Sequence, residues 1–377
     1  MKLAFYIKQI VKMAVQHVYL PILYFFHSRG KVQKGLVIFA DAHHNTIPFS
    51  MEKMHDEVSK LENIEIREMY LDFQNCGIKT LVLWLNCFMK VYGKAEYVFI
   101  CDNFLPVSSC KKRAETKVIQ LWHSGGLLKK AGYDTADSVP EIYKGNVFRN
   151  YDLLTASAEC CVEVLSRSFL QPEGVVKATG ISRSDVYFDE EYNHRCCEEF
   201  YAEYPYAKGK KIVLWVPTFR GNAADPKLEG EQELDKAFER LSDCFLVKKL
   251  HPHFESKHAD KISCKIPSER LLPVADLLIT DYSSIVFDYL AYKKPFVLFA
   301  PDLEEYQKNH GFYLPYDSYP ATVAKTSGQL IKAVEYELSS RDRSQLEECY
   351  NYHMGACDGH STDRILRLIG LKNKSSS

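Results

Sequence analysis

Short apolar runs recur along the chain and are separated by segments of helical length. The runs are residues 36–40, 97–101, 118–122, 153–156, 175–178, 212–216, 245–247, 277–280 and 296–300. Apolar runs that alternate with helical patterns are typical of parallel sheets covered by helices on both faces. The pattern therefore predicts an α/β fold with two doubly wound, Rossmann-like domains that face each other across a cleft.

Proline, glycine and lysine residues interrupt this pattern in the stretch EYPYAKGKK, residues 203–211. Such residues are typical of a boundary between domains. The predicted organisation is an amino-terminal segment (1–34), a first α/β domain (35–205), a second α/β domain (206–345) and a carboxyl-terminal helix (346–371). That last helix is able to pack back on the first domain.

The amino-terminal segment combines apolar spacing with positive charge. Six lysine and arginine residues precede the first acid, Asp41, and at helical spacing one face of the segment is apolar. That face carries Leu3, Ile7, Ile10, Val11, Ala14 and Val18. The uncharged stretch 13–26 is shorter than the roughly 20 apolar residues of a membrane-spanning helix. We predict an amphipathic helix on the surface of an anionic membrane; a helix packed on the domain in the ordinary way is the alternative.

Composition narrows the classes of partner. The formal net charge of -1 gives no indication of a nucleic-acid partner. The 12 cysteines include no CxxC pair and contain two adjacent couples, which favours reduced thiols over a disulfide framework. The histidines lack the spacing of metal ligands, so no metal site is predicted.

A first polar cluster follows the run 118–122. Its polar and glycine residues are His123, Gly125, Gly126, Lys129 and Lys130. His123 can take a proton from a hydroxyl near neutral pH, although a structural loop histidine is the alternative. The two glycines permit a tight turn, and a helix that begins at Leu127 would offer N–H groups to an anion, with the two lysines beside it.

A second cluster, TGISRSD, follows the run 175–178. Gly180 turns the chain, Arg183 can bind a phosphate or a carboxylate, and Asp185 can orient that arginine. A surface ion pair between Arg183 and Asp185 explains the same residues equally well.

In the second half, polar residues follow three further runs. Ligands of doubly wound sheets bind at the carboxyl ends of the strands, so these residues are candidates for a nucleotide site. They are Thr218 and Arg220 after 212–216, Lys249 and His251 after 245–247, and Asp281, Ser283 and Ser284 after 277–280. A solvated loop histidine is the alternative for His251.

The stretch LLITDYSSIVFD places Asp281, Ser283 and Ser284 between a strand and a predicted helix, 285–292. One polar residue at a helix start is a routine cap. Three polar groups in four residues exceed that need and predict a diphosphate site. Glu304 and Glu305, after the next strand, can accept hydrogen bonds from a ribose or a base. The chain contains neither a Walker loop nor GxGxxG, which argues against kinases and dehydrogenases and favours a transferase with a nucleotide-activated donor.

These clusters, in this order, resemble the CDP-glycerol glycerophosphotransferase family, which builds polymers of the teichoic-acid type. The resemblance extends over residues 36–369. It is most specific in ADLLITDYSSIVFDYLAYKKPFVLFAPDLEEYQKNHGFYLPYD, residues 275–317, and it includes DGHSTDR, residues 358–364. The resemblance implies a GT-B fold, a peripheral protein at the cytoplasmic face of the cell membrane, and no cofactor. It also implies transfer of glycerol phosphate from CDP-glycerol to a hydroxyl of a lipid-linked acceptor, with release of CMP.

The resemblance also implies roles for single residues. His123 would be the base on the acceptor hydroxyl, and His251 would stabilise charge on the diphosphate. The residues that hold the diphosphate would be Thr218, Arg220, Ser283 and Ser284, while Asp134, Arg183 and Asp185 match family blocks on the acceptor side. The chain departs from the family at Ser124, at Ser182 and around His43 and His44, so the acceptor is the least constrained part of the prediction.

Three other functions fit the same residues. CDP-ribitol shares the CDP group with CDP-glycerol and is a second possible donor. A GT-B glycosyltransferase would use a UDP- or GDP-sugar, and a binding protein without turnover would hold the donor only. Nothing in the sequence separates addition of one unit from polymerisation.

Overall fold

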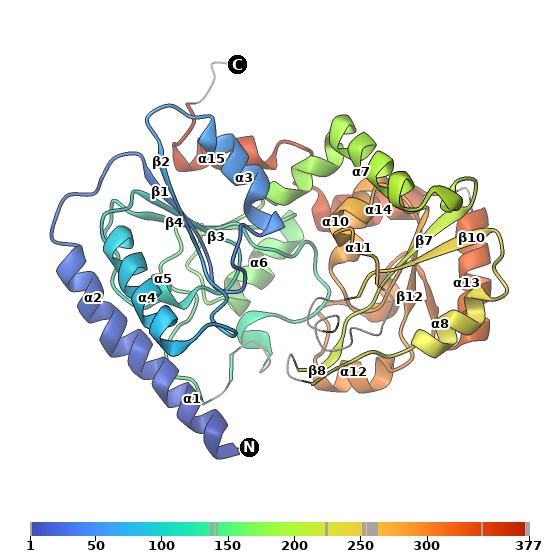
Figure 1. The fold of residues 1–377 in the computed structure, drawn as a ribbon, viewed down its shortest axis with the longest axis horizontal. Coiled ribbons are helices and arrows are strands. Elements are labelled where there is room, and N and C mark those ends of the chain that lie inside the picture. The colour runs from blue at the N-terminus through green and yellow to red at the C-terminus, as the bar shows by residue number, and fades with distance from the viewer. Residues whose placement is uncertain are drawn as a thin grey trace. The chain divides into compact units, whose positions relative to one another are not determined.

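All nine apolar runs form strands of two parallel sheets in the computed structural model (Figure 1). It describes residues 2–373 except 136–138, 141, 223–224, 251–253, 255–262 and 341. The chain divides into two units. Unit 1 is Met1–His123, Ala131–Asp185 and Ala356–Ser377, and unit 2 is Ser124–Lys130 and Val186–Gly355.

The sheet of unit 1 has six strands in the order β2-β1-β3-β4-β5-β6, all parallel. The strands are β1 (Leu36–Asp41), β2 (Glu65–Tyr70), β3 (Tyr97–Ile100), β4 (Lys117–Gln120), β5 (Leu153–Thr155) and β6 (Val176–Lys177). The helices are α1 (Lys2–Ala14), η1 (Val15–Tyr19), α2 (Leu20–His27), α3 (Phe49–Ser59), α4 (Ile78–Tyr92), α5 (Leu105–Ser108), η2 (Gly132–Asp134), α6 (Glu159–Ser168) and α15 (Ser361–Ile369). Because the strands are parallel, all their carboxyl ends lie at one edge of the sheet.

The main sheet of unit 2 has five parallel strands in the order β10-β7-β11-β12-β13. They are β7 (Lys211–Val216), β10 (Cys244–Lys248), β11 (Leu277–Thr280), β12 (Phe296–Phe299) and β13 (Thr322–Ala324), and β8 (Arg220–Asn222) pairs antiparallel with β9 (Asp225–Lys227). The α-helices are α7 (Glu190–Glu203), α8 (Glu231–Phe238), α10 (Ser268–Leu271), α11 (Ile285–Tyr289), α12 (Leu303–Asn309), α13 (Ser327–Ser339) and α14 (Ser344–Met354). Short 3₁₀ segments of unit 2 are η4 (Pro205–Ala207), η5 (Leu290–Tyr292) and η6 (Tyr316–Ser318), and η3 (Ser182–Phe188) runs from unit 1 into unit 2. The helix predicted at 285–292 is confirmed as α11 followed by η5.

Two strands of the main sheets escaped the sequence pattern, β2 and β13. Each is an outermost strand of its sheet, with a neighbouring strand on one side only. An edge strand is covered by fewer neighbours than a central strand, so it does not need a continuous apolar run. In β2, EIREMY, the side chains are half-buried or exposed. Its polar residues therefore hid it from a search for apolar runs.

The chain passes between the units at places other than the predicted boundary at 203–211. Helix α7 lies in unit 2, where Phe200 is buried and its ring lies 6.4 Å from that of Phe245. The predicted helix 346–371 is two helices: α14 belongs to unit 2, and after Gly355 the chain returns to unit 1 and forms α15.

Helix α15 is anchored to unit 1 by Asp185. This buried carboxylate accepts the backbone N–H groups of Ser361 (2.9 Å) and Thr362 (2.7 Å), which open the helix. Gly180 has φ of 77°, and a Cβ there would lie 2.2 Å from the Ser361 hydroxyl, so only glycine fits. The blocks TGISRSD and DGHSTDR therefore contact one another, and the carboxylate of Asp185 caps a helix.

The segment Ser124–Lys130 packs within unit 2 and is not helical, so the helix predicted to begin at Leu127 is wrong. Its backbone groups bond to distant partners. Leu127 donates its N–H to Nδ1 of His353 (3.3 Å), and the Leu128 carbonyl accepts the N–H of Tyr313 (3.0 Å). The Leu127 carbonyl accepts the hydroxyl of Tyr319. These long-range bonds replace the local bonds of a helix.

The predicted amino-terminal helix is present, and its polar side packs against the rest of unit 1. A π-helical turn, η1, joins α1 to α2. Within it Gln16 is fully buried and donates to the hydroxyl of Ser108 (3.1 Å), and His17 Nε2 lies 2.9 Å from the carbonyl oxygen of Lys144. The apolar residues Ile7, Ile10, Val11 and Val18 are exposed. Among the described residues, no helix has the length and hydropathy to span a bilayer.

Asp185→Ala should destabilise unit 1 by about 2 kcal/mol, because two N–H groups that bond to a buried carboxylate lose their acceptor. Limited trypsin digestion should then cut faster at Arg364 and Arg367. Asp189, an exposed cap that accepts the N–H groups of Glu191 and Tyr192, is the matched control. Equal losses in Asp185→Ala and Asp189→Ala, measured by urea unfolding, would contradict this role.

The stability of unit 2 should fall as the pH falls from about 6.5 to about 4. Burial lowers the pKa of His353 from 6.5 to about 4, so in this window the unfolded chain binds a proton that the folded chain does not. The loss is about 2–3 kcal/mol by pH 4.5. Urea unfolding of His353→Gln should show a smaller decrease between pH 7 and pH 4.5. The exposed His194→Gln is the control, and a His353→Gln curve parallel to wild type would disprove the assignment.

Candidate active site

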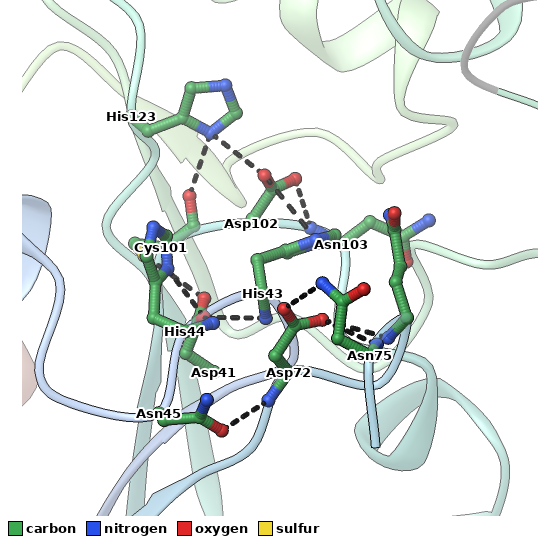
Figure 2. Close-up of polar contacts among 11 residues, drawn as sticks. Asp41, His43, His44, Asn45, Asp72, Asn75, Cys101, Asp102, Asn103 and His123 are labelled. Atoms are coloured by element: carbon green, nitrogen blue, oxygen red, sulfur yellow. Dashed lines mark hydrogen bonds and ion pairs between the residues drawn. The ribbon is translucent and has the colours of Figure 1, made fainter. Parts of the chain in front are cut away.

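Polar side chains of unit 1 gather where β1, β2, β3 and β4 end (Figure 2). Asp41 ends β1, Asp72 follows β2, Asp102 follows β3 and His123 follows β4. His43 and His44 lie in the loop after β1. Parallel pairing therefore brings acids and imidazoles from four separate loops to one edge of the sheet, as expected for the ligand-binding edge of a doubly wound sheet.

The ring of His123 has a defined orientation. Its Nδ1 lies 3.1 Å from the carbonyl oxygen of Cys101 and 3.6 Å from Oδ2 of Asp102. A carbonyl and a carboxylate only accept hydrogen bonds, so we infer that the hydrogen is on Nδ1. The lone pair is then on Nε2, and the side chain is 41% exposed. His123 thus has the geometry of a general base whose charged form a carboxylate stabilises.

Asp102 is a site residue that the sequence reading missed. Its Oδ1 accepts the backbone N–H of Asn103 (2.6 Å), which leaves Oδ2 to face the imidazoles. The signal was present in the sequence, because Asp102 directly follows the run 97–101, just as the predicted site residues follow the other runs. CDNF contains a single acid and no glycine or hydroxyl, so it stood out less than WHSGG.

A second imidazole, that of His44, is paired with Asp41. Its Nδ1 lies 2.9 Å from Oδ2 of Asp41, and that oxygen also accepts the backbone N–H groups of His43 and His44. Burial by itself raises the pKa of Asp41, but these hydrogen bonds outweigh it and lower the pKa below its usual value. The hydrogen bond to Asp41 raises the pKa of His44 in spite of burial. Asp41 thus fixes the loop that carries both histidines.

In unit 2 the corresponding edge holds a buried ion-pair network around Arg220. The guanidinium donates from Nε and Nη2 to both oxygens of Asp302 (2.6 and 2.9 Å), and its Nη1 lies 3.0 Å from Oδ2 of Asp281. Nη1 also donates to the carbonyl of Thr218 (2.6 Å). Although burial lowers the pKa of Arg220, the two carboxylates raise it above its usual value. Arg220 therefore links strand ends, instead of presenting an unpaired fork to a phosphate.

Two tyrosines enclose this network. The rings of Tyr282 and Tyr306 stack with centroids 3.6 Å apart, and the Tyr282 hydroxyl donates to Oδ1 of Asp302 (3.0 Å). The Arg220 guanidinium lies 4.8 Å from the Tyr282 ring centroid. Oδ1 of Asp281 accepts the N–H groups of Thr218 (2.9 Å) and Tyr282 (2.6 Å). Asp302 completes the site. The sequence did not predict it and indicated the nearby Glu304 and Glu305 instead.

The hydroxyls predicted to bind a diphosphate lie beside this network and are half-buried. Ser283 Oγ accepts the N–H of Ile285 (3.3 Å), and the carbonyl of Ser284 accepts the N–H of Phe287 (3.0 Å). Within this turn, then, N–H groups at the start of α11 already bond to local acceptors. Thr218, Ser283 and Ser284 are the partly exposed hydroxyl groups of the predicted donor site.

The glycines of the loop after His123 are needed for packing within unit 2. A Cβ on Gly125 would lie 2.5 Å from Sδ of Met354. Gly126 has φ of 59°, and a Cβ there would lie 2.5 Å from the ring of Phe287. Lys129 forms a β-bridge with Phe312, and Lys130 is exposed next to Gly311. The loop is thus built against protein, which accounts for the glycines without a ligand.

The other predicted residues are placed as follows. Asp134 pairs with Arg167 (2.8 Å), and Glu304, on the exposed surface of α12 beside Glu305, pairs with Lys325 (3.3 Å). Lys249 donates to the carbonyl of Cys264 (2.8 Å). Arg183 is half-buried, and its charge partly opposes the rise that burial causes in the pKa of the Cys101 thiol. Asp185 is the helix cap described above, and His251 lies outside the described residues.

No metal centre accompanies these groups in the part of the chain that the structure describes: no three histidine, cysteine or acidic side chains there are arranged to hold an ion. All 12 cysteines are free, including Cys160 and Cys161, whose sulfur atoms lie 3.8 Å apart.

Comparison with known proteins identifies relatives over most of the chain. The chain is 28% identical to teichoic acid ribitol-phosphate primase of Bacillus spizizenii, over 90% of this chain and 91% of that protein. It is 32% identical to teichoic acid ribitol-phosphate polymerase TarL of Staphylococcus aureus, over 74% of this chain but only 52% of that protein. Among solved structures, the wall teichoic acid polymerase TagF superposes with a TM-score of 0.74 over 97% of this chain and 98% of that chain, at 18% identity. The chain thus shares the fold of TagF.

Residues 22–371 match the family described as CDP-Glycerol:Poly(glycerophosphate) glycerophosphotransferase. The match includes the carboxyl ends of the strands of both main sheets, and with them Asp102, His123, Asp281 and Asp302. This chain therefore belongs to the CDP-glycerol:poly(glycerophosphate) glycerophosphotransferase family.

Proposed function

We propose that this enzyme transfers a polyol phosphate from a CDP-linked polyol to a hydroxyl of a membrane-bound, lipid-linked acceptor and releases CMP. The observation that carries the proposal is the orientation of His123. Its Nδ1 is directed at Cys101 and Asp102, and its Nε2 is available at the ligand-binding edge of unit 1. A hydroxyl placed at Nε2 can lose its proton as it reacts.

The proposed step is a displacement at phosphorus. The acceptor oxygen forms a bond to the phosphorus that carries the polyol, and the bond from that phosphorus to the CMP oxygen breaks. His123 receives the hydroxyl proton, Asp102 stabilises the imidazolium, and CMP leaves with the electron pair. Positioning and charge stabilisation contribute most of the rate in such a reaction, because CMP is already a good leaving group. The placement of the two domains across a cleft, and the role of His251 on the diphosphate, stay predictions.

Two donors compete in this proposal. The sequence resemblance implied CDP-glycerol, which the family description also names. The relatives favour CDP-ribitol, since the primase that matches over nine-tenths of both chains bears a ribitol-phosphate name. A glycerol-phosphate primase of Bacillus subtilis matches at 29% identity over 72% of this chain. We therefore propose ribitol phosphate as the first candidate for the transferred group and glycerol phosphate as the second.

Purified protein, supplied with a membrane lipid extract, should release CMP from CDP-ribitol or CDP-glycerol and release no nucleotide from UDP-glucose. His123→Ala should lower CMP release about 10²–10⁴-fold and leave donor binding intact, because the base acts only on the acceptor hydroxyl. His194→Ala, an exposed histidine of α7, is the control. Turnover of UDP-glucose alone would indicate a glycosyltransferase, and donor binding without CMP release would indicate a binding protein. A His123→Ala variant at the wild-type rate would remove the base assignment.

We also propose that the protein attaches to the cytoplasmic face of the cell membrane through its amino-terminal helix. The supporting observation is that the helix buries its polar side, including Gln9 and Gln16, and exposes its apolar side. A surface helix of a globular protein typically buries its apolar side and exposes its polar side. Ile22, Phe25 and Phe26 continue the apolar surface along α2, and Ile78 and Leu83 of the neighbouring α4 are also exposed. Arg29, whose guanidinium lies 4.8 Å from the ring centroid of Phe25 and 5.1 Å from that of Phe26, places positive charge beside this apolar surface, which suits an anionic bilayer.

Replacing Ile10, Val11 and Val18 by serine should lower binding to anionic vesicles about tenfold or more, because the apolar area that enters the bilayer is lost. These side chains are more than half exposed, so the fold should be retained, whereas deleting the helix would remove the buried Leu20 and Tyr24. Replacing Tyr206 and Tyr336, exposed residues of unit 2, by serine is the control. Equal sedimentation of the triple variant and wild type with vesicles would contradict the proposal.

A further inference from the structure

Asp102 faces two imidazoles with one oxygen. Its Oδ2 lies 3.6 Å from Nδ1 of His123 and 3.8 Å from Nε2 of His43, and the three side chains are similarly exposed, at 37–41% (Figure 2). Its other oxygen accepts the N–H of Asn103. A single negative charge is therefore available to two groups that each become positive on protonation.

We propose that His43 is a positioning residue of the active site: it shares the carboxylate of Asp102 with His123 and thereby controls how readily His123 takes up a proton. This inference rests on the proposed role of His123 as the base. His43 itself touches none of the reacting atoms in the proposal and acts through Asp102.

The coupling follows from charge. When His43 is protonated, it neutralises Asp102 and places a second positive charge near the His123 ring. Both effects oppose protonation of His123, so its Nε2 stays a free base to lower pH. Two groups that share one counter-charge titrate as a coupled pair. Because all three side chains are partly exposed to solvent, the coupling is modest, about 0.3–1 pH unit.

The loop holds His43 in place for this role. Oδ2 of Asp41 accepts the backbone N–H of His43 at 2.7 Å, and Asp72 is itself fixed by the N–H groups of Gln74 (2.9 Å) and Asn75 (3.2 Å). The charges of Asp41 and Asp72 both interact with His43. Other titratable or charged groups act on the cluster from neighbouring elements: His44 after β1, Cys101 after β3, Tyr151 before β5 and Arg183 after β6.

His44 and His43 differ in the carboxylate that their rings contact. Its ring bonds to Asp41, a buried carboxylate, at 2.9 Å, whereas the ring of His43 reaches the carboxylate that faces His123. The two histidines are neighbours in the same loop, so His44→Gln is a matched control for His43→Gln.

The test is an NMR titration of the full chain labelled with ¹³C-histidine, with the His123 signal assigned from its absence in His123→Asn. In His43→Gln the midpoint of the His123 signal should rise by about 0.3–1 pH unit, and in His44→Gln it should move less, because the His44 ring bonds to Asp41 and not to Asp102. In an Asp102→Asn background, His43→Gln should produce a much smaller shift, because the shared charge is gone. Equal midpoints in His43→Gln and wild type, or equal shifts in the two Gln variants, would overturn the proposal.

The pH profile of CMP release extends the test to catalysis. The acidic limb should move to higher pH in His43→Gln and in step with the NMR midpoint. An unmoved limb beside a moved midpoint would overturn the control of the base by His43. The NMR titration needs no substrate, so a wild-type chain that releases no CMP would count against the proposed function and leave the sharing of Asp102 to be decided separately.

Discussion

The parallel pairing of β3 with β4 is the constraint on which the candidate base depends. The register aligns Ile100 with Gln120, so the two strands end at the same level. The Cys101 carbonyl and the Asp102 carboxylate then lie beside the chain that leads to His123. Trp122 turns the chain with φ of 53°, a costly conformation for a non-glycine residue, and its indole packs 4.8 Å from the ring of Phe169. A shift in register would separate the imidazole from both of its acceptors.

Charge is arranged differently at the carboxyl ends of the strands in the two main sheets. In unit 1, the carboxylates of Asp41, Asp72 and Asp102 fix loops and orient imidazoles. The side chains of Asp102, His43 and His123 are 37–41% exposed and stay reachable from solvent. In unit 2, one guanidinium is held by two carboxylates in a mostly buried network. A buried charge is costly unless it is paired, so removing Arg220 would leave two acids without their counter-charge. The Arg220, Asp281 and Asp302 network carries a net charge of about -1. A diphosphate donor therefore needs positive charge from outside this network, and residues 249–261 are where the sequence offers lysines and histidines.

Several residues that marked the family in the sequence are structural in this chain. Asp185 caps α15, Gly180 makes room for Ser361, and Gly125 and Gly126 make room for Met354 and Phe287. These contacts hold together segments that are far apart in sequence. A motif can thus be specific to a family because its fold needs the residue, even where the residue is not positioned to touch a substrate.

The sequence by itself determined the strands, the α/β class, the candidate base and the family, because apolar runs and the polar residues that follow them are local signals. It missed β2 and β13, since edge strands need no continuous apolar run. It did not show that Arg220 pairs with Asp302, that Asp185 caps a helix or that Leu127 bonds to His353, because these partners lie 82, 177 and 226 residues apart in the chain. Only the tertiary structure decided that Asp102 stands beside His123, that His43 shares that carboxylate, and that the amino-terminal helix turns its polar side inward. Each of these depends on which strands and helices are neighbours in space, and local sequence patterns do not contain that information.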